Sequence, residues 1–206
     1  MLRERLQALD SEWRQVPRAV EFERLIEERL GANRVRHSIS VTKVLHLVAG
    51  DLGLDTASAV SAGLLHDSCK AMKNEAMLET AERYGIPLNE THMERPNLLH
   101  GHVAAALCRH EWHVADESVC EAIAWHVTGH PGLGLLGQAL FFADFSEPLR
   151  EHPESDEALR IYDAQCFRSA LRYAARAKLD HLRKKGLLID PNTEAFCAWL
   201  DTRGVV

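Results

Sequence analysis

Several signals are missing from this sequence of 206 residues, and each absence removes a class of protein. The five cysteines are widely spaced and form no Cys-x-x-Cys pair, which argues against a zinc knuckle or a disulfide framework. No stretch approaches the ~18 apolar residues of a membrane span, and the charged N-terminal segment has no apolar signal core. We therefore expect a cytoplasmic protein with reduced thiols and no membrane partner.

Excess positive charge is also missing, since the formal net charge is −6. A chain of this sign offers no broad basic field for a nucleic acid backbone, so no nucleic acid polymer is expected as a partner. The same charge is compatible with a local cationic pocket for a small polyphosphate.

Alternating β patterns and internal repeats are absent as well, whereas apolar residues recur at helical spacing along most of the chain. The hydrophobic content of 46% is enough for one sizeable core. The pattern predicts an all-α helical bundle. Its expected helices include residues 2–13, 34–52 and 155–185, with a long polar loop at 85–97 bordering a pocket.

Polar groups that bind metals are placed on apolar helical segments. His66-Asp67 ends an apolar helix, and the other members of the set, on further helices, are His37, His100, His126 and Asp144. Burying even a neutral polar group without a partner costs roughly 2 to 7 kcal/mol, so six such groups around one core call for a shared partner. Two divalent cations, bridged by Asp67, would satisfy them.

The chemistry of the donors selects the ion. Histidine nitrogens combined with carboxylates suit iron, manganese, cobalt, nickel or zinc better than magnesium or calcium. Such a pair of ions lowers the pKa of a shared water and stabilises charge on phosphoryl oxygens, which favours hydrolysis of a phosphoester or phosphoanhydride.

Each residue taken singly also has an ordinary explanation. His37 fits a satisfied core histidine, His100 a helix start, His126 a cation at a helix C-terminus and Asp144 half of an ion pair. The ordered series His, His-Asp, His, His, Asp makes the metal interpretation the stronger one.

The series resembles the HD-domain superfamily of metal-dependent phosphohydrolases, and in particular its branch of symmetrical diadenosine tetraphosphate hydrolases. The resemblance covers about residues 21–200 and leaves residues 1–18 as a helical extension before a hydrolase domain at 19–206. The matching stretches are Arg34-x-x-His37-x-x-x-Val41, Ala62-Gly63-Leu64-Leu65-His66-Asp67-x-x-Lys70, Leu98-Leu99-His100-Gly101, Ala122-Ile123-x-x-His126-x-Thr128-Gly129 and Ala143-Asp144-x-x-Glu147-Pro148-x-Arg150.

The resemblance implies an HD-domain helical bundle with a dinuclear iron site that cuts the substrate into two nucleoside diphosphates. It assigns His37, His66, Asp67 and Asp144 to one ion and Asp67, His100 and His126 to the other. Lys70 and Arg150 are then expected to stabilise phosphate charge, and the loop Thr128-Gly129-His130 to contact substrate. The sequence departs from the family pattern at Val127, at His130 and at Phe145-Ser146.

Two alternatives remain open at this stage. The same metals could serve another nucleotide, such as a nucleoside mono- or diphosphate or a deoxynucleotide, or the chain could be a regulatory module that binds metal and nucleotide without turnover. A homodimer is a further possibility, since Trp13, Trp112 and Trp125 could form a subunit surface or fill the core.

Overall fold

Helices make up the ordered elements of the computed structural model, which describes residues 1–150 and 152–202. Within these residues there is no β-strand, so the all-α prediction is confirmed. The helices are α1 (Leu2–Ala8), α2 (Ala19–Arg29), α3 (Ala32–Leu52), α4 (Thr56–Leu65), α5 (Asn74–Arg83), α6 (Glu90–Glu94), α7 (His100–His110), α8 (Glu117–Trp125), α9 (Leu135–Ser146), α10 (Pro153–Ala164), α11 (Phe167–Lys184) and α12 (Pro191–Thr202), with short 3₁₀ turns η1 (Glu12–Gln15) and η2 (Pro96–Leu99).

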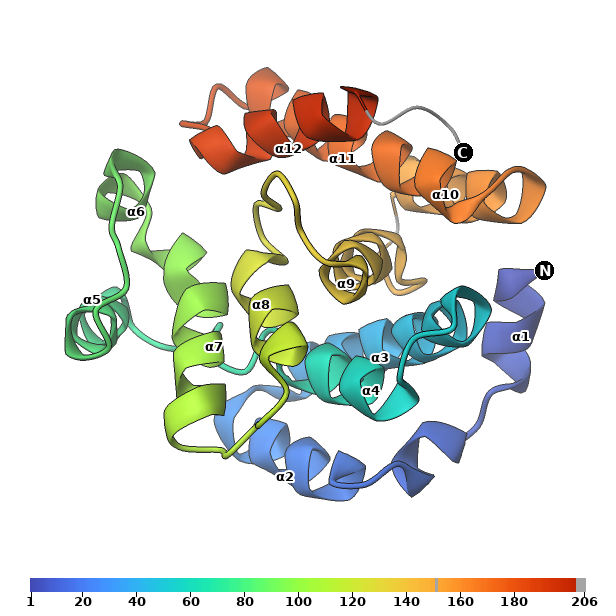
Figure 1. Cartoon of the computed structure of the whole chain (residues 1–206), viewed down its shortest axis with the longest axis horizontal. Coiled ribbons are helices and arrows are strands. Elements are labelled where there is room, and N and C mark those ends of the chain that lie inside the picture. Colours follow the sequence, from blue (N-terminus) through green and yellow to red (C-terminus); the bar gives the residue numbers. More distant parts are fainter. Residues whose placement is uncertain (151, 203–206) are drawn as a thin grey trace.

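Helix α3 lies at the centre of the bundle and packs against both α4 and α9 (Figure 1). The pair α7 and α8 lies alongside, with α8 touching α4 and α9. Helices α10, α11 and α12 form a layer across one side, and α11 contacts α9 directly (Figure 1).

The sequence explains why α3 and α4 pack so closely. Helix α3 buries His37, Val41, Val44 and Val48, which recur every three or four residues and therefore share one face. Helix α4 starts at Asp55, whose carboxylate accepts the backbone N–H of Ser58 as an N-cap. Its apolar residues are then buried on nearly every side, because α2, α3 and α8 all pack against it.

Three of the predicted ligands stand at helix ends that meet in the middle of this bundle. His66 and His126 follow the last residues of α4 and α8, and His100 is the first residue of α7. Backbone groups at helix ends lack intrahelical partners, so side chains there have carbonyls available for hydrogen bonds.

The predicted helix over residues 2–13 is wrong. Helix α1 ends at Ala8, Leu9 is extended, and the chain restarts as η1. Asp10 and Ser11 at the break favour turns over helix interiors. The break lets Leu9 and Trp13 both enter the core, where Trp13 is fully buried, so Trp13 is not part of an exposed subunit surface.

Two further predictions on local structure need correction. Residues 85–97 are not one long loop, because Asn89 caps α6 in a reciprocal capping box with His92. The helix predicted over 155–185 is two helices, broken at Gln165 and Cys166. No proline or glycine marks that break; the turn instead brings Phe167 onto Phe142, with ring centroids 5.8 Å apart.

Residues 1–18 lie against the bundle. The backbone N–H of Leu2 donates to Asp163 at 2.8 Å, and Lys43 donates to the carbonyl of Leu9 at 3.0 Å. The division at residue 18 into an extension and a hydrolase domain stays a prediction. None of the helices in the described ranges has the length and apolar character to cross a bilayer.

The close approach of α3 and α4 generates a stability prediction at Gly63. A Cβ there would lie 2.8 Å from Thr42 Cα, a backbone atom that cannot move alone. We expect Gly63→Ala to lower the free energy of unfolding by about 1–3 kcal/mol through overpacking, as measured by denaturant unfolding.

The matched control is Gly50→Ala in α3, because a Cβ at Gly50 would meet nothing within 4 Å. Relief of the helix-interior glycine cost should make this variant about 0.5–1 kcal/mol more stable. Equal stabilisation of both variants would contradict the close approach at Gly63.

Candidate metal centre

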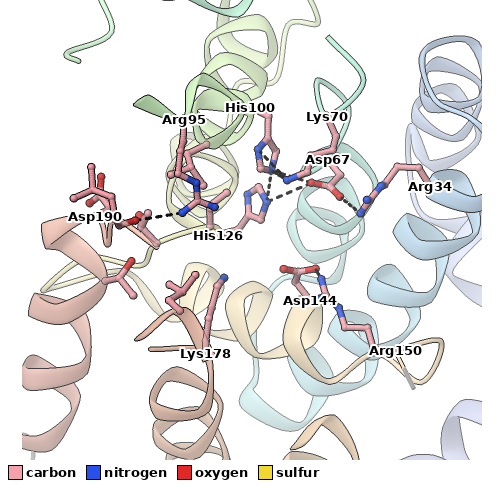
Figure 2. Close-up of a pocket in the computed structure, with 16 residues that line it drawn as sticks. Arg34, Asp67, Lys70, Arg95, His100, His126, Asp144, Arg150, Lys178 and Asp190 are labelled. Atoms are coloured by element: carbon pink, nitrogen blue, oxygen red, sulfur yellow. Dashed lines mark hydrogen bonds and ion pairs between the residues drawn. The ribbon is translucent and has the colours of Figure 1, made fainter. Parts of the chain in front are cut away.

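The carboxylate of Asp67 faces two separate groups of histidines, one with each oxygen; Figure 2 shows one of these groups, His100 and His126. Its Oδ1 lies 3.0 Å from His100 Nε2 and 3.6 Å from His126 Nε2. Its Oδ2 lies 3.6 Å from His37 Nε2 and 3.7 Å from His66 Nε2. Asp67 therefore stands between two donor sets, as a bridging carboxylate would.

Asp144 completes the second set from the opposite side. Its Oδ1 lies 3.2 Å from His37 Nε2 and 3.9 Å from His66 Nε2. Among the described residues, two groups have ligand atoms close enough to hold an ion: His37, His66 and Asp67, and Asp67, His100 and His126. All six residues singled out in the sequence therefore meet at one place.

Hydrogen bonds at Nδ1 orient all four imidazoles. Three of them lie against backbone carbonyls three residues earlier in the chain: His66 Nδ1 on Gly63 at 2.8 Å, His100 Nδ1 on Asn97 at 2.7 Å and His126 Nδ1 on Ile123 at 2.7 Å. A carbonyl only accepts, so each Nδ1 carries the proton. His37 Nδ1 lies 3.0 Å from Glu147 Oε1, which fixes the same tautomer. In each ring the Nε2 lone pair thus faces the centre.

These lone pairs require a cation. His100 Nε2 and His126 Nε2 are 3.1 Å apart, so two acceptors face each other. The Nε2 atoms of His37 and His66 are buried without a hydrogen-bond partner in the described chain. Buried polar atoms of this kind are rare in native proteins unless something satisfies them. The donor set therefore fits a divalent metal.

Burial keeps two of the imidazoles neutral. It lowers the pKa of His66 to about 3 and that of His100 to about 4. Burial also acts to lower the pKa of His37, but the neighbouring carboxylates of Asp144 and Glu147 outweigh it and raise the value to about 9. Without metal, a proton on His37 therefore partly balances the negative charge of the carboxylates. Metal binding requires the neutral imidazole, so His37 must release this proton when an ion binds.

Both carboxylates are held in their ionised form, with pKa values well below the usual range. Burial would raise the pKa of Asp144, but the charge of Arg150, whose guanidinium donates to Oδ1 at 2.6 Å, holds it well below its usual range. Burial likewise opposes ionisation of Asp67, while the surrounding imidazoles, His66 first, keep its pKa low. Arg34 also donates to Asp67 Oδ2, at 2.8 Å.

A cavity of about 220 Å³ opens onto this centre. Five cationic side chains line it: Arg34, Lys70, Arg95, Arg150 and Lys178. Figure 2 shows them around the same space; Arg34 comes from α3 and Lys178 from α11, and the other three come from connecting segments. A chain with a net charge of −6 therefore concentrates positive charge at one concave site, where it attracts polyanions.

The predicted substrate contacts divide into two groups. Lys70, Arg150 and Thr128 line the cavity, and Lys70 Nζ lies 3.3 Å from His100 Nδ1. Gly129 does not line it, because this residue, at φ 67°, packs under the ring of Phe196. His130 also lies outside the lining, with its ring against Trp125 and its Nδ1 donating to the Pro131 carbonyl. Substrate contact by Gly129 and His130 stays a prediction.

The sequence reasoning gave no role to four residues of the site, namely Arg34, Arg95, Glu147 and Lys178. Glu147 orients His37, and Lys178 reaches the cavity from α11. Lys178 had a signal in the sequence, because it interrupts the buried stripe of Leu171, Ala174 and Ala175 at helical spacing. Nothing in the local sequence pairs Glu147 with His37, which is 110 positions away.

Comparison with known proteins supports this picture. The sequence profile of the HD domain family matches residues 34–167. A symmetrical bis(5'-nucleosyl)-tetraphosphatase of Bacillus subtilis is 29% identical over 85% of this chain and 93% of its own. The protein of the same name from Halalkalibacterium halodurans is 31% identical over 83% of this chain and 90% of its own. A crystal structure from Clostridium acetobutylicum, described as a predicted HD superfamily hydrolase involved in NAD metabolism, aligns with a TM-score of 0.84 at 29% identity, covering 89% of this chain and 97% of that one.

A helical bundle built around two histidine-rich donor sets with a shared carboxylate defines a divalent-metal-binding protein. The chain belongs to the HD domain family and, within it, to the family of the symmetrical bis(5'-nucleosyl)-tetraphosphatases.

The contact between Glu147 and His37 generates a prediction on metal binding. In Glu147→Ala the Nδ1 proton of His37 loses its acceptor, so the ring is no longer held with Nε2 towards the centre. We expect metal affinity, measured by competition with a chromogenic chelator, to fall about 10- to 100-fold.

Glu79→Ala is the control, because Glu79 is an exposed residue of α5, away from the site. It should bind metal like the wild type. Unchanged affinity in Glu147→Ala would show that the carboxylate does not orient the ligand.

Proposed function

We propose that this protein hydrolyses diadenosine tetraphosphate symmetrically to two molecules of ADP. The observation that carries the proposal is Asp67, whose two oxygens face separate histidine sets inside a cavity lined by five cations. The relatives that match along most of this chain are named for the same reaction.

The residues present fit two divalent ions, one held by His37, His66, Asp67 and Asp144 and the other by Asp67, His100 and His126. Iron is the ion we propose, with manganese, cobalt, nickel and zinc as alternatives, because four imidazoles and two carboxylates suit borderline metals. When bound, such ions act as Lewis acids towards phosphoryl oxygens and lower the pKa of water.

The chain's own cations supply the rest of the chemistry. Both products of a cut at the central anhydride carry negative charge on their phosphates, so the site must stabilise charge as the bond breaks. Lys70 stands beside His100, and Arg150 stands beside Asp144, so one cation flanks each donor set. Guanidinium groups retain further N–H donors for phosphate oxygens while they hold the carboxylates.

The products test the reaction. Metal-loaded protein incubated with diadenosine tetraphosphate should give ADP alone, because the cut falls between the second and third phosphates. Separation by anion-exchange chromatography measures this. ATP together with AMP, or no turnover, would contradict the proposal.

The same assay separates the alternatives. Turnover confined to nucleoside mono- or diphosphates or to deoxynucleotides would indicate another phosphohydrolase. Nucleotide retention without product, unaffected by Asp67→Asn, would indicate a binding module.

The shared carboxylate generates a prediction on metal content. We expect elemental analysis of protein purified without added metal to find two transition-metal ions per chain. His37→Ala and His126→Ala should each retain one ion, because each removes a ligand from one set only. Asp67→Ala should retain neither. Equal loss in all three variants would argue against two separate donor sets.

A further inference from the structure

A second cavity, of about 240 Å³, adjoins the one that opens onto the metal centre. The two cavities share four lining residues: Asp144, Arg150, Lys178 and Leu182. Their junction therefore lies at a predicted metal ligand flanked by two cations. Anything bound across the centre can extend into both.

The second cavity differs in chemistry from the first. Apart from Arg150 and Lys178 at the junction, no lysine or arginine of the described chain lines it. Its wall includes an apolar part made by Ala177, Leu182 and the half-buried ring of Phe145, which follows Asp144 directly in α9. His152, Glu154 and His181 add hydrogen-bonding groups, whereas the Ser155 hydroxyl already donates to backbone carbonyls. Such a wall suits a heterocycle with polar edges better than a phosphate.

Lys178 is held at the junction by its surroundings. Its Nζ lies 4.6 Å from the centroid of the Phe141 ring, in a cation–π contact. Burial lowers the pKa of Lys178 to about 8. An anion bound next to it would favour the protonated amine. Lys178 and Leu182 are one turn apart on α11, so the same helix face presents a cation to the junction and an apolar group beside it.

We propose that the second cavity is a nucleoside subsite, which takes one end of the dinucleotide with its base against Phe145 and Leu182 and its phosphates on Arg150 and Lys178. This inference rests on the proposed function. A symmetrical cut leaves one nucleoside and two phosphates on each side of the centre, so each half needs its own space. The other half lies in the first cavity, whose lining includes the apolar residues Leu98, Val127 and Leu188.

The metal ligands and part of the subsite come from different regions of the chain. All predicted metal ligands lie within residues 34–167, the part that matches the HD domain profile. Lys178, His181 and Leu182 lie beyond it, in α11. Helix α11 thus completes a subsite whose other wall, including Phe145 and Arg150, belongs to the matched domain.

Ala177→Trp tests the subsite, because Ala177 lines the second cavity and not the first, and an indole there occupies its space. Isothermal titration of metal-loaded protein with the product ADP gives the number of sites, and titration with inorganic pyrophosphate reports the phosphate contacts. We expect the wild type to bind two ADP per chain and Ala177→Trp to bind one, with pyrophosphate binding retained. The KM for diadenosine tetraphosphate should rise at least tenfold.

Ala198→Trp is the matched control, since it places the same side chain on an exposed position of α12 outside both cavities. It should keep two ADP sites and the wild-type KM. Phe145→Ala provides a second variant, which should weaken one ADP site without filling the cavity. Circular dichroism and thermal melting verify folding in all three.

One ADP per chain in the wild type, or two in Ala177→Trp, overturns the subsite. Failure of the proposed function has a different signature: products other than ADP, or no turnover, with two-site ADP binding intact.

Discussion

The fold depends on one carboxylate, that of Asp67, surrounded by imidazoles in a core that admits little water. Its Oδ1 and Oδ2 each face two Nε2 atoms within 3.7 Å, and the residue is only 3% exposed. A buried charge is tolerated only with close compensation. The helix ends of α4, α7 and α8 converge on Asp67, and a divalent metal held by their histidines would supply that compensation. The apolar packing of α3, α4 and α9 encloses the centre on the side away from the cavity.

Positive charge is organised around this carboxylate in two layers. Arg34 and Arg150 pair directly with Asp67 and Asp144. Lys70, Arg95 and Lys178 line the cavity without a salt bridge to either carboxylate among the described contacts. The first layer preserves the metal site, and the second remains available to a polyanion. The cavity thus has a high local density of cations, although the whole chain carries a net negative charge.

The sequence predicted the parts of the structure that short-range pattern determines. Each of the six ligands lies on or beside an apolar helix face, so its burial could be inferred from spacing alone, and the ordered series indicated the family. Features that depend on contacts between distant parts of the chain could not be predicted in this way. The pairing of Glu147 with His37 and the break at Gln165 arise from tertiary packing, since neither leaves a local signal. His130, expected to contact substrate, lies against Trp125 at a ring-centroid distance of 4.6 Å and is not among the residues that line the cavity, so that contact stays a prediction. Lys178 had a visible signal in the α11 stripe, which the charge-rich composition of that helix obscured.

The positions of His66, His100 and His126 at helix termini also limit how the chain length can vary. An inserted residue within α4 or α8 rotates everything beyond it by about 100° and shifts it by about 1.5 Å, which would swing an imidazole off the centre. The lengths of α4 and α8 are therefore constrained by the need to keep their imidazoles at the centre. We expect insertions to be accommodated instead in the connection at 111–116, which joins the ends of α7 and α8 opposite to His100 and His126.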